Sequence, residues 1–429
     1  MPPLRLPRPL TLPYPLYLLA VAVFAMGTSE FMLAGLLPDI ASDLDVSVGT
    51  ASTLTSAFAI GMVVGAPLAA ALSRDWPRRS TLFGCVVTFA AAHGMGACTT
   101  GFPVLFAARV VAALANAGFL AVALTVAATL VPPDKKGRAL AVLLAGTTLA
   151  TVVGVPGGSL LGALFGWRAT FWAVAALCLP AALGILRGIP AEHATGRTTE
   201  QTTGGPALRA ELAQLTRPKL LHVLLLGTLV NAATFAGFTF LAPVVTDIAG
   251  LSDAWVPVSL ALFGAGAFAG VTVAGRLSDR YPGRVVAVGG PLALTGWCAL
   301  AVLADAPITL LALVCVQGAL SFALGSTLIT RVLYEASAAP VMAGSYATAA
   351  LNIGAAAGPL VAAATLGTGA GTLGPLWASG FLIAVALLIA LVGARFAPRG
   401  RARTRQPASS ETGAPGTRRS PPLRSCHRR

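Results

Sequence analysis

Two residues of opposite charge stand inside long apolar stretches of the chain. Glu30 is the one acid deep within such a stretch, and Arg109 is the one basic residue inside one. If these stretches cross a bilayer, each charge costs at least about 2.5–3.5 kcal/mol, which makes its residue a candidate for function. Burial disfavours an ionised carboxyl group and a nearby guanidinium favours it, so Glu30 beside Arg109 is suited to take up and release a proton. The alternative is a permanent salt bridge that only fixes packing.

A second set of side chains has the amides and rings that a binding cavity needs. Asn116 follows Arg109 by seven residues and therefore shares its helix face. Amides and aromatic rings together suit a neutral amphiphile with an aromatic ring. Each member has an alternative role in helix packing. We interpret His93 as a packing residue and Asp39 as a weaker second candidate for the proton-carrying acid. The remaining cavity candidates are Phe31, Asn231, Phe235, Phe238 and Gln317.

The composition indicates that membrane helices carry these residues. The 429 residues are 56% hydrophobic and 10% charged, with a mean hydropathy of +0.81. Because soluble domains are about 25% charged, a water-soluble globular enzyme is excluded. Five of the six cysteines lie in apolar runs and read as buried hydrophobic residues. We therefore expect neither disulfides nor a metal site, and no cofactor other than the proton as coupling ion.

Twelve apolar runs are long enough to cross a bilayer as α-helices. With two exceptions, Arg109 and Arg168, every Lys and Arg then falls on one side, which the positive-inside rule places in the cytoplasm with both termini. This distribution accounts for the net charge of +14 without a nucleic-acid partner. The sequence thus predicts a multi-pass protein of the inner (cytoplasmic) membrane. The runs are 16–37, 51–72, 80–98, 103–130, 139–163, 169–187, 220–243, 256–275, 285–303, 308–330, 341–366 and 375–396.

Composition between the runs predicts how the chain is divided. A polar, glycine-containing stretch at 188–219 reads as a cytoplasmic linker loop, and an Arg-, Pro- and Ser-rich stretch at 398–429 reads as a disordered basic tail. Residues 1–14 form a short cytoplasmic N-terminal segment. The remainder divides into two six-helix bundles at 15–187 and 220–397, and we expect the protein to be a monomer.

The two halves repeat each other. Gly61, Gly65 and Leu72 coincide with Gly266, Gly270 and Leu277 at a constant shift, and the tryptophans at 172 and 377 keep that shift. A repeat of six spans in the same orientation implies two bundles related by a pseudo-two-fold axis along the membrane normal. Substrate sites in such folds lie between the halves near the membrane midplane.

The loop that follows the eighth run resembles the signature loop of the major facilitator superfamily. It reads Gly-Arg-Leu-Ser-Asp-Arg-Tyr-Pro-Gly-Arg over residues 275–284, and its copy in the first half inverts the Asp–Arg order. The resemblance implies the fold of that superfamily. It also implies gating loops built from Arg74, Asp75, Arg79, Gly275, Asp279, Arg280 and Arg284.

Further motifs are similar to those of twelve-span drug:proton antiporters. Residues 27–41 resemble the first span of that family, and Arg109 with Leu105 matches its fourth-span Arg motif. Segments 166–172, 331–335 and 343–352 resemble the chloramphenicol-resistance exporters within the family. The antiporter motif of the fifth span is matched, with its proline displaced by one residue, by Gly154, Pro156, Gly157 and Gly158, and more cleanly in the eleventh run by Gly358 and Pro359.

These resemblances imply a proton-coupled efflux transporter that exports a neutral amphiphilic drug, chloramphenicol or a related phenicol, by alternating access. A second hypothesis is the export of an endogenous metabolite such as a sugar. A third, a membrane-integral enzyme, predicts a cluster of Ser, His and Asp or of metal ligands within the spans, and the sequence has none. The partners expected are the drug, protons and the lipid bilayer.

Overall fold

Within the residues that the structure describes, the chain is almost entirely helical. The computed structural model describes residues 13–72, 77–132, 136–189, 213–278, 281–337 and 343–396. The expected N-terminal segment, apart from its last two residues, lies outside these ranges. So do most of the expected linker and all of the tail predicted at 398–429.

The first half contains six spans, of which the first and fifth are interrupted. In the first span, α1 ends at Phe31 and the chain tightens into a 3-10 helix, η1. In the fifth, the π-helix η3 separates α6 from α7. The elements are α1 Tyr14–Phe31, η1 Met32–Gly35, α2 Leu37–Asp43, α3 Val48–Leu72, α4 Arg78–Cys98, α5 Phe102–Thr129, α6 Lys136–Leu149, η3 Ala150–Gly154, α7 Val155–Phe165 and α8 Trp167–Gly188.

The second half follows the same order of long helices. Both α4 and its counterpart α13 contain 21 residues, as the sequence repeat predicts. A second π-helix, η6, follows the short α11. The elements are η5 Ala213–Thr216, α10 Pro218–Thr239, α11 Leu241–Pro243, η6 Val244–Ile248, α12 Trp255–Ser278, α13 Pro282–Val302, α14 Pro307–Glu335, α15 Ala343–Leu366, η7 Gly371–Leu373 and α16 Gly374–Phe396.

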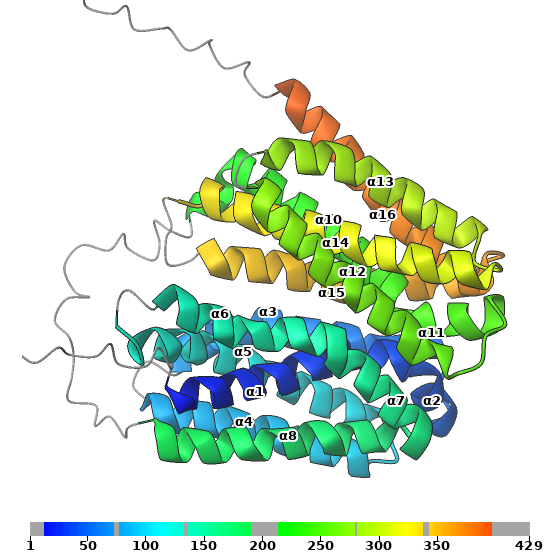
Figure 1. Cartoon of the computed structure of the whole chain (residues 1–429). Coiled ribbons are helices and arrows are strands. Elements are labelled where there is room, and N and C mark those ends of the chain that lie inside the picture. Colours follow the sequence, from blue (N-terminus) through cyan, green and yellow to red (C-terminus); the bar gives the residue numbers. More distant parts are fainter. Residues whose placement is uncertain are drawn as a thin grey trace, which may run out of the picture.

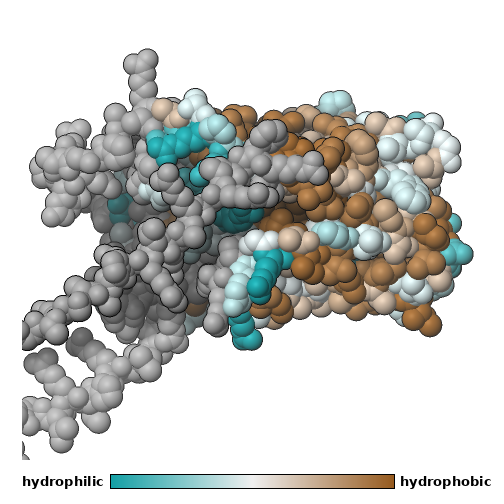
Figure 2. All heavy atoms as spheres, turned by 90° about the horizontal axis from the view of Figure 1, so that it is seen from above, coloured by the Kyte–Doolittle hydropathy of each residue, from teal (hydrophilic) through white to brown (hydrophobic). Residues whose placement is uncertain are grey.

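Twelve helical segments of the described chain are long and apolar enough to cross a membrane, which confirms the predicted number of spans. Large apolar side chains on them are exposed, including Ile308, Leu391 and Phe381. Figure 2 shows hydrophobic residues covering much of the surface between the two ends of the molecule. Such a surface suits contact with lipid tails rather than with water.

Each half has its own hydrophobic core. One cluster of buried residues comes only from 16–189, and another comes almost entirely from 220–386. Figure 1 shows the two halves as layers, with α1 to α8 below and α10 to α16 above. The sequence repeat therefore corresponds to two packed units with an interface between them.

The two ends of the molecule differ in charge. Short connections at one end, called here the acidic end, contain Asp39, Asp43, Asp45, Asp247, Asp253 and Asp305. There the Asp43 carboxylate pairs with Arg168 of α8 and accepts a hydrogen bond from Trp167 Nε1 at 3.3 Å. The opposite end, the basic end, contains the described Arg79, Lys136, Arg187, Lys219, Arg276, Arg284 and Arg331.

The two halves meet mainly towards the acidic end. Ser56 Oγ of α3 donates a hydrogen bond to the Ala356 carbonyl of α15 at 2.7 Å. Gly49 of α3 packs beside Ala363 and Leu366 of α15. Helix α12 contacts η3 and α7, which form the acidic-end part of the fifth span. The ribbons of the two halves diverge towards the left of Figure 1, where the basic end lies. The structure is thus closed at the acidic end.

Candidate functional site

Glu30 lies half-buried in the last turn of α1, where that helix changes its form. The last α-helical hydrogen bond runs from the Met32 N–H to the Thr28 carbonyl, and η1 begins at Met32. An i→i+3 turn that follows an i→i+4 turn skips one carbonyl group. Here the skipped group is the carbonyl of Ser29, which has no α-helical donor.

Arg109 supplies that missing donor. Its Nη2 donates to the Ser29 carbonyl oxygen at 3.1 Å, and its Nη1 donates to Ser29 Oγ at 2.7 Å. The guanidinium also lies 4.4 Å from the centre of the Phe58 ring of α3. Arg109 is 1% exposed and Ser29 is fully buried. Both bonds have a charged donor, which makes them stronger than neutral hydrogen bonds.

His93 of α4 completes this buried network. Its Nε2 lies 2.7 Å from Ser29 Oγ and its Nδ1 lies 2.8 Å from the Phe89 carbonyl oxygen. A carbonyl only accepts hydrogen bonds, so the network assigns the hydrogen of a neutral ring to Nδ1 and leaves Nε2 to accept from the Ser29 hydroxyl. The chain of bonds then runs from Arg109 through Ser29 to His93.

Glu30 and Arg109 are close but not directly bonded. Their charges interact electrostatically, yet among the described residues no hydrogen bond or ion pair joins them. Arg109 Nε is buried without a hydrogen-bond partner. The structure therefore brings together the two charged residues that the sequence singled out, and places Ser29 on the guanidinium.

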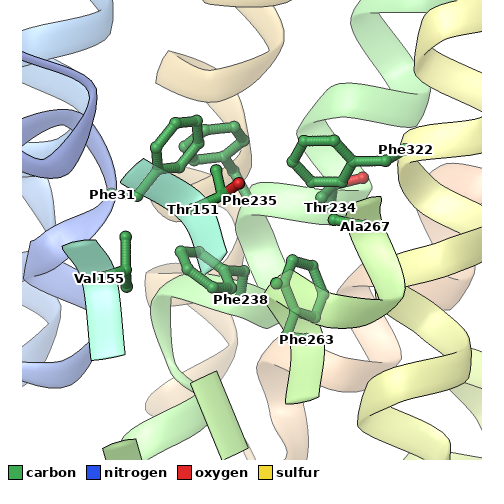
Figure 3. Close-up of a pocket in the computed structure, with 10 residues that line it drawn as sticks. Phe31, Thr151, Val155, Thr234, Phe235, Phe238, Phe263, Ala267 and Phe322 are labelled. Carbon is green, nitrogen blue, oxygen red and sulfur yellow. The ribbon is translucent and has the colours of Figure 1, made fainter. Parts of the chain in front are cut away.

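A small aromatic pocket lies between the two halves, and Phe31, the residue after Glu30, is one of its lining residues. Phe31 enters it from α1, and the other rings come from α10, α12 and α14 (Figure 3). The ring centre of Phe31 lies 5.6 Å from that of Phe235 and 6.3 Å from that of Phe238. The pocket's phenylalanines are Phe31, Phe235, Phe238, Phe263 and Phe322.

The polar groups of this pocket are two threonine hydroxyls. Thr151 Oγ1 donates to the Thr148 carbonyl at 2.9 Å, and Thr234 Oγ1 donates to the Val230 carbonyl at 2.9 Å. Each hydroxyl hydrogen is used within its own helical segment, so the oxygen offers a ligand only lone pairs. The pocket is therefore suited to a ligand with an aromatic ring and few hydrogen-bond donors.

The three predicted amides do not line this pocket. Asn231 Nδ2 donates to the Leu351 carbonyl of α15 at 2.7 Å. Gln317 Nε2 donates to the Ala293 carbonyl of α13 at 3.0 Å, in a contact between α13 and α14. Asn116 is 1% exposed on α5, and its Oδ1 has no hydrogen-bond partner. In this conformation Asn231 and Gln317 join helices of the second half.

Three of the four antiporter-motif glycines lie at contacts between helices. Gly154 ends η3, and a methyl group there would overlap Thr28 Oγ1 of α1. Pro156 is the second residue of α7, Gly158 packs beside Thr170 of α8, and Gly157 has open space around it. In the second half, a methyl group at Gly358 would overlap the Ala232 carbonyl of α10, and Pro359 lies within α15.

The predicted gating loops are described only in part. Arg74, Asp75, Asp279 and Arg280 lie outside the described residues. Arg79 is half-buried at the start of α4, and Gly275 lies in α12. Arg284 is exposed on α13, with its guanidinium 4.6 Å from the centre of the Tyr281 ring.

Asp39 lies outside the buried network, on α2 at the acidic end. Partial burial raises the pKa of its carboxyl group, and the negative charge of Asp253, which belongs to the other half, raises it further. Asp39 thus faces the other half electrostatically, and its part as a second proton-carrying acid stays a prediction.

Reasoning from the sequence missed the role of Ser29 and gave His93 a packing role only. His93 does pack between rings, with its centre 4.3 Å from that of Phe89 and 5.6 Å from that of Phe171. It also accepts the hydroxyl of Ser29. The available signal was the hydrogen-bonding capacity of Arg109, because five buried N–H donors require acceptors on neighbouring helices.

Comparison with known proteins identifies relatives over most of the chain. The family model described as the Major Facilitator Superfamily matches residues 19–341. A chloramphenicol resistance protein of Streptomyces lividans is 76% identical over 379 residues, which cover 88% of this chain and 96% of that protein. The inner membrane transport protein YdhP of Escherichia coli K12 is 33% identical over 385 residues, which cover 90% of this chain and 97% of that protein.

Solved structures share the fold at low sequence identity. An inward-facing, occupied bacterial homologue of the human lysosomal transporter Spinster has a TM-score of 0.71 at 17% identity and covers 88% of this chain and 96% of its own. A peptide transporter has a TM-score of 0.72 at 14% identity and covers 89% of this chain and 95% of its own. These similarities concern the arrangement of helices alone.

Proposed function

Because the chain belongs to the Major Facilitator Superfamily, a family of transporters rather than enzymes, we propose that it exports a neutral amphiphilic drug in exchange for protons. The expected similarity to chloramphenicol-resistance exporters is confirmed by the relative from Streptomyces lividans. That similarity makes chloramphenicol or a related phenicol the first drug to test. The coupling ion is the proton, and the working unit is the monomer.

The coupling proposal depends on one observation. Glu30, which carries the carboxyl group, directly precedes Phe31, which lines the aromatic pocket. Glu30 interacts with the charge of Arg109, and Phe31 reaches into the pocket between the halves. A ligand that displaces the Phe31 ring therefore moves the backbone that holds Glu30. Bound drug and protonated Glu30 exclude each other if each stabilises a different conformation of this turn.

The orientation of the protein in the membrane follows from the charge of its two ends. By the positive-inside rule the basic end and both termini are cytoplasmic, so the structure is closed towards the outside. Glu30 takes a proton when the acidic end opens and releases it when the basic end opens. The inward movement of each proton releases about 2.3 kcal/mol of free energy per 100 mV of membrane potential. The basic-end loops around Arg79 and Arg284 gate the inner side, and the glycines of the fifth and eleventh spans permit the helices to rearrange.

The chemistry of the pocket supports a phenicol over a sugar. A phenicol presents an aryl ring and a few hydroxyl and amide donors, which match five phenyl rings and two hydroxyl oxygens. A sugar would bury many hydroxyl groups without partners in such a pocket, and each unmade hydrogen bond costs about 1–3 kcal/mol. Export of an endogenous sugar remains the competing outcome of the experiment.

Uptake of labelled chloramphenicol into everted membrane vesicles tests this proposal. We expect accumulation that an uncoupler abolishes. Glu30→Gln removes the titrating group without changing its size, so it should abolish the uncoupler-sensitive part. Glu335→Gln is the matched control, because Glu335 is exposed at the end of α14 and should leave accumulation unchanged.

Two results would contradict the proposal in different ways. Full uncoupler-sensitive accumulation by Glu30→Gln would remove Glu30 as the coupling acid. Vesicles that ignore chloramphenicol but accumulate a labelled sugar would favour the metabolite exporter.

A further inference from the structure

The guanidinium of Arg109 bonds to Ser29 and interacts electrostatically with Glu30, the next residue of α1. In this structure both of its hydrogen bonds to described residues go to Ser29, and neither goes to the carboxyl group of Glu30 next in the chain. Its Nε has no acceptor. A buried N–H donor without an acceptor costs free energy, so an alternative position that satisfied it would be favoured by that amount. An ionised Glu30 would offer it a charged acceptor in place of two neutral ones.

His93 strengthens the interaction of Arg109 with Ser29. A hydroxyl group that donates its hydrogen to an imidazole nitrogen becomes a better acceptor for a second donor, because hydrogen bonds in a chain polarise one another. His93 is 1% exposed and is held by the Phe89 carbonyl and by flanking rings, so Nε2 is fixed in place. The imidazole thus strengthens the bond from Arg109 to Ser29 without touching Arg109.

Among the residues that the structure describes, no further charged group belongs to the network. Its titratable and charged groups are Glu30 on α1, His93 on α4 and Arg109 on α5. Helix α3 faces the guanidinium with the ring of Phe58, and α8 faces the imidazole with the ring of Phe171. The position of the guanidinium is therefore governed by the competition between Ser29 and Glu30.

We propose that Ser29 and His93 are positioning residues that hold Arg109 away from Glu30 while the carboxyl group is protonated and release it when the carboxyl group ionises. The inference rests on the proposed proton coupling and adds a change of helix form that follows ionisation. Release of Arg109 frees the Ser29 carbonyl for the Leu33 N–H, which converts the start of η1 to α-helix. That conversion moves Gly35, which packs without a side chain against Ser159 and Leu260 of the closed acidic end.

The pH dependence of drug binding tests the inference. Binding of labelled chloramphenicol to the purified full chain is measured across pH, where ionisation of Glu30 sets the midpoint. In Ser29→Ala the guanidinium loses a strong alternative partner and pairs more readily with Glu30. The carboxylate is then easier to form, so the midpoint should move to lower pH by about one unit, a tenfold change in proton concentration. His93→Phe should move it in the same direction by a smaller amount.

Two control variants separate positioning from packing. His93→Gln can still accept the Ser29 hydroxyl and should restore the wild-type midpoint. Ser52→Ala removes another buried serine, whose hydroxyl bonds only within its own helix at 2.7 Å from the Gly49 carbonyl, and should leave the midpoint unchanged. A purely structural role would lower the amount of binding without moving the midpoint.

The outcomes distinguish failure of the positioning role from failure of the proposed proton coupling. Wild-type midpoints in both Ser29→Ala and His93→Phe, with pH dependence lost in Glu30→Gln, would overturn the positioning role and leave proton coupling intact. Should Ser29→Ala fail to fold, His93→Phe against His93→Gln still decides the matter. If the pH dependence persists in Glu30→Gln, the proposed coupling fails and the inference fails with it.

Discussion

At the scale of single residues, Phe238 is the most connected ring of the aromatic pocket. Its centre lies 6.5 Å from that of Phe235 and 4.8 Å from that of Phe263. Aromatic pairs contribute about 0.5–1.5 kcal/mol each, so Phe238→Ala should weaken chloramphenicol binding about threefold to tenfold. The measurement is equilibrium binding to the purified protein. Phe381→Ala is the control, because Phe381 is 65% exposed, and it should bind normally. Equal affinities in the two variants would place the drug elsewhere.

The same scale shows what the sequence can and cannot predict about a site. Glu30 and Arg109 stand out because charge is rare in apolar runs, and Phe31, Phe235 and Phe238 do meet in one pocket. The link through Ser29 was not predictable, because local spacing says nothing about which residue of another helix lies opposite. Serine in a membrane helix commonly bonds its own backbone, which gives Ser29 no distinguishing signal.

At the scale of elements, two glycines of α12 pack closely against backbone atoms of different halves. A methyl group at Gly264 would overlap the Thr151 carbonyl of η3, in the other half, whereas one at Gly270 would overlap the Ala319 carbonyl of α14, in the same half. Backbone atoms cannot rotate aside, so in each case whole elements must move. Gly264→Ala should drive the halves apart at the acidic end without unfolding either. Gly270→Ala should destabilise the second half itself.

Spin labels measure the first effect and thermal unfolding measures the second. Labels on cysteines introduced at Thr50 and Gly369, both exposed at the acidic end, report the separation of the halves in a background without native cysteines. We expect longer distances in Gly264→Ala at an unchanged unfolding temperature, and a lower unfolding temperature in Gly270→Ala. A drop in unfolding temperature for both variants, with unchanged distances, would refute this division.

The elements themselves were largely predictable, and their interruptions were not. Hydropathy located all twelve spans, because about 20 apolar residues in a row have few other uses. The change to a 3-10 helix at Met32 and the π-helix at Ala150–Gly154 alter the helix by less than one residue per turn. Such shifts leave the hydropathy pattern intact, although these two interruptions place Phe31, Thr151 and Val155 at the pocket.

At the scale of the whole molecule, closure brings like charges together. Asp39 of the first half and Asp253 of the second interact at the acidic end, where the halves meet. Closure therefore works against their mutual repulsion whenever both are ionised. Apolar contacts between the halves, such as the packing of Phe31 against the cluster that contains Ala355 and Ala356, oppose that repulsion. The balance between the two sets of forces depends on the protonation of Asp39.

The sign of that dependence can be derived from the pKa of Asp39. Its pKa is raised in the closed arrangement, first by burial and then by Asp253, and both causes weaken when the halves separate. The closed form therefore binds the proton more tightly, so closure is favoured at low pH and lost as pH rises through the raised pKa. The labels at positions 50 and 369 should report longer distances as pH rises above the ordinary range of a carboxyl group.

Asp253→Asn removes one of the two causes that raise the pKa of Asp39, so the transition should become smaller and move to lower pH. Asp305→Asn serves as a control that keeps both acids. A transition that Asp253→Asn leaves unchanged would show that repulsion between these two carboxylates has no part in opening the acidic end.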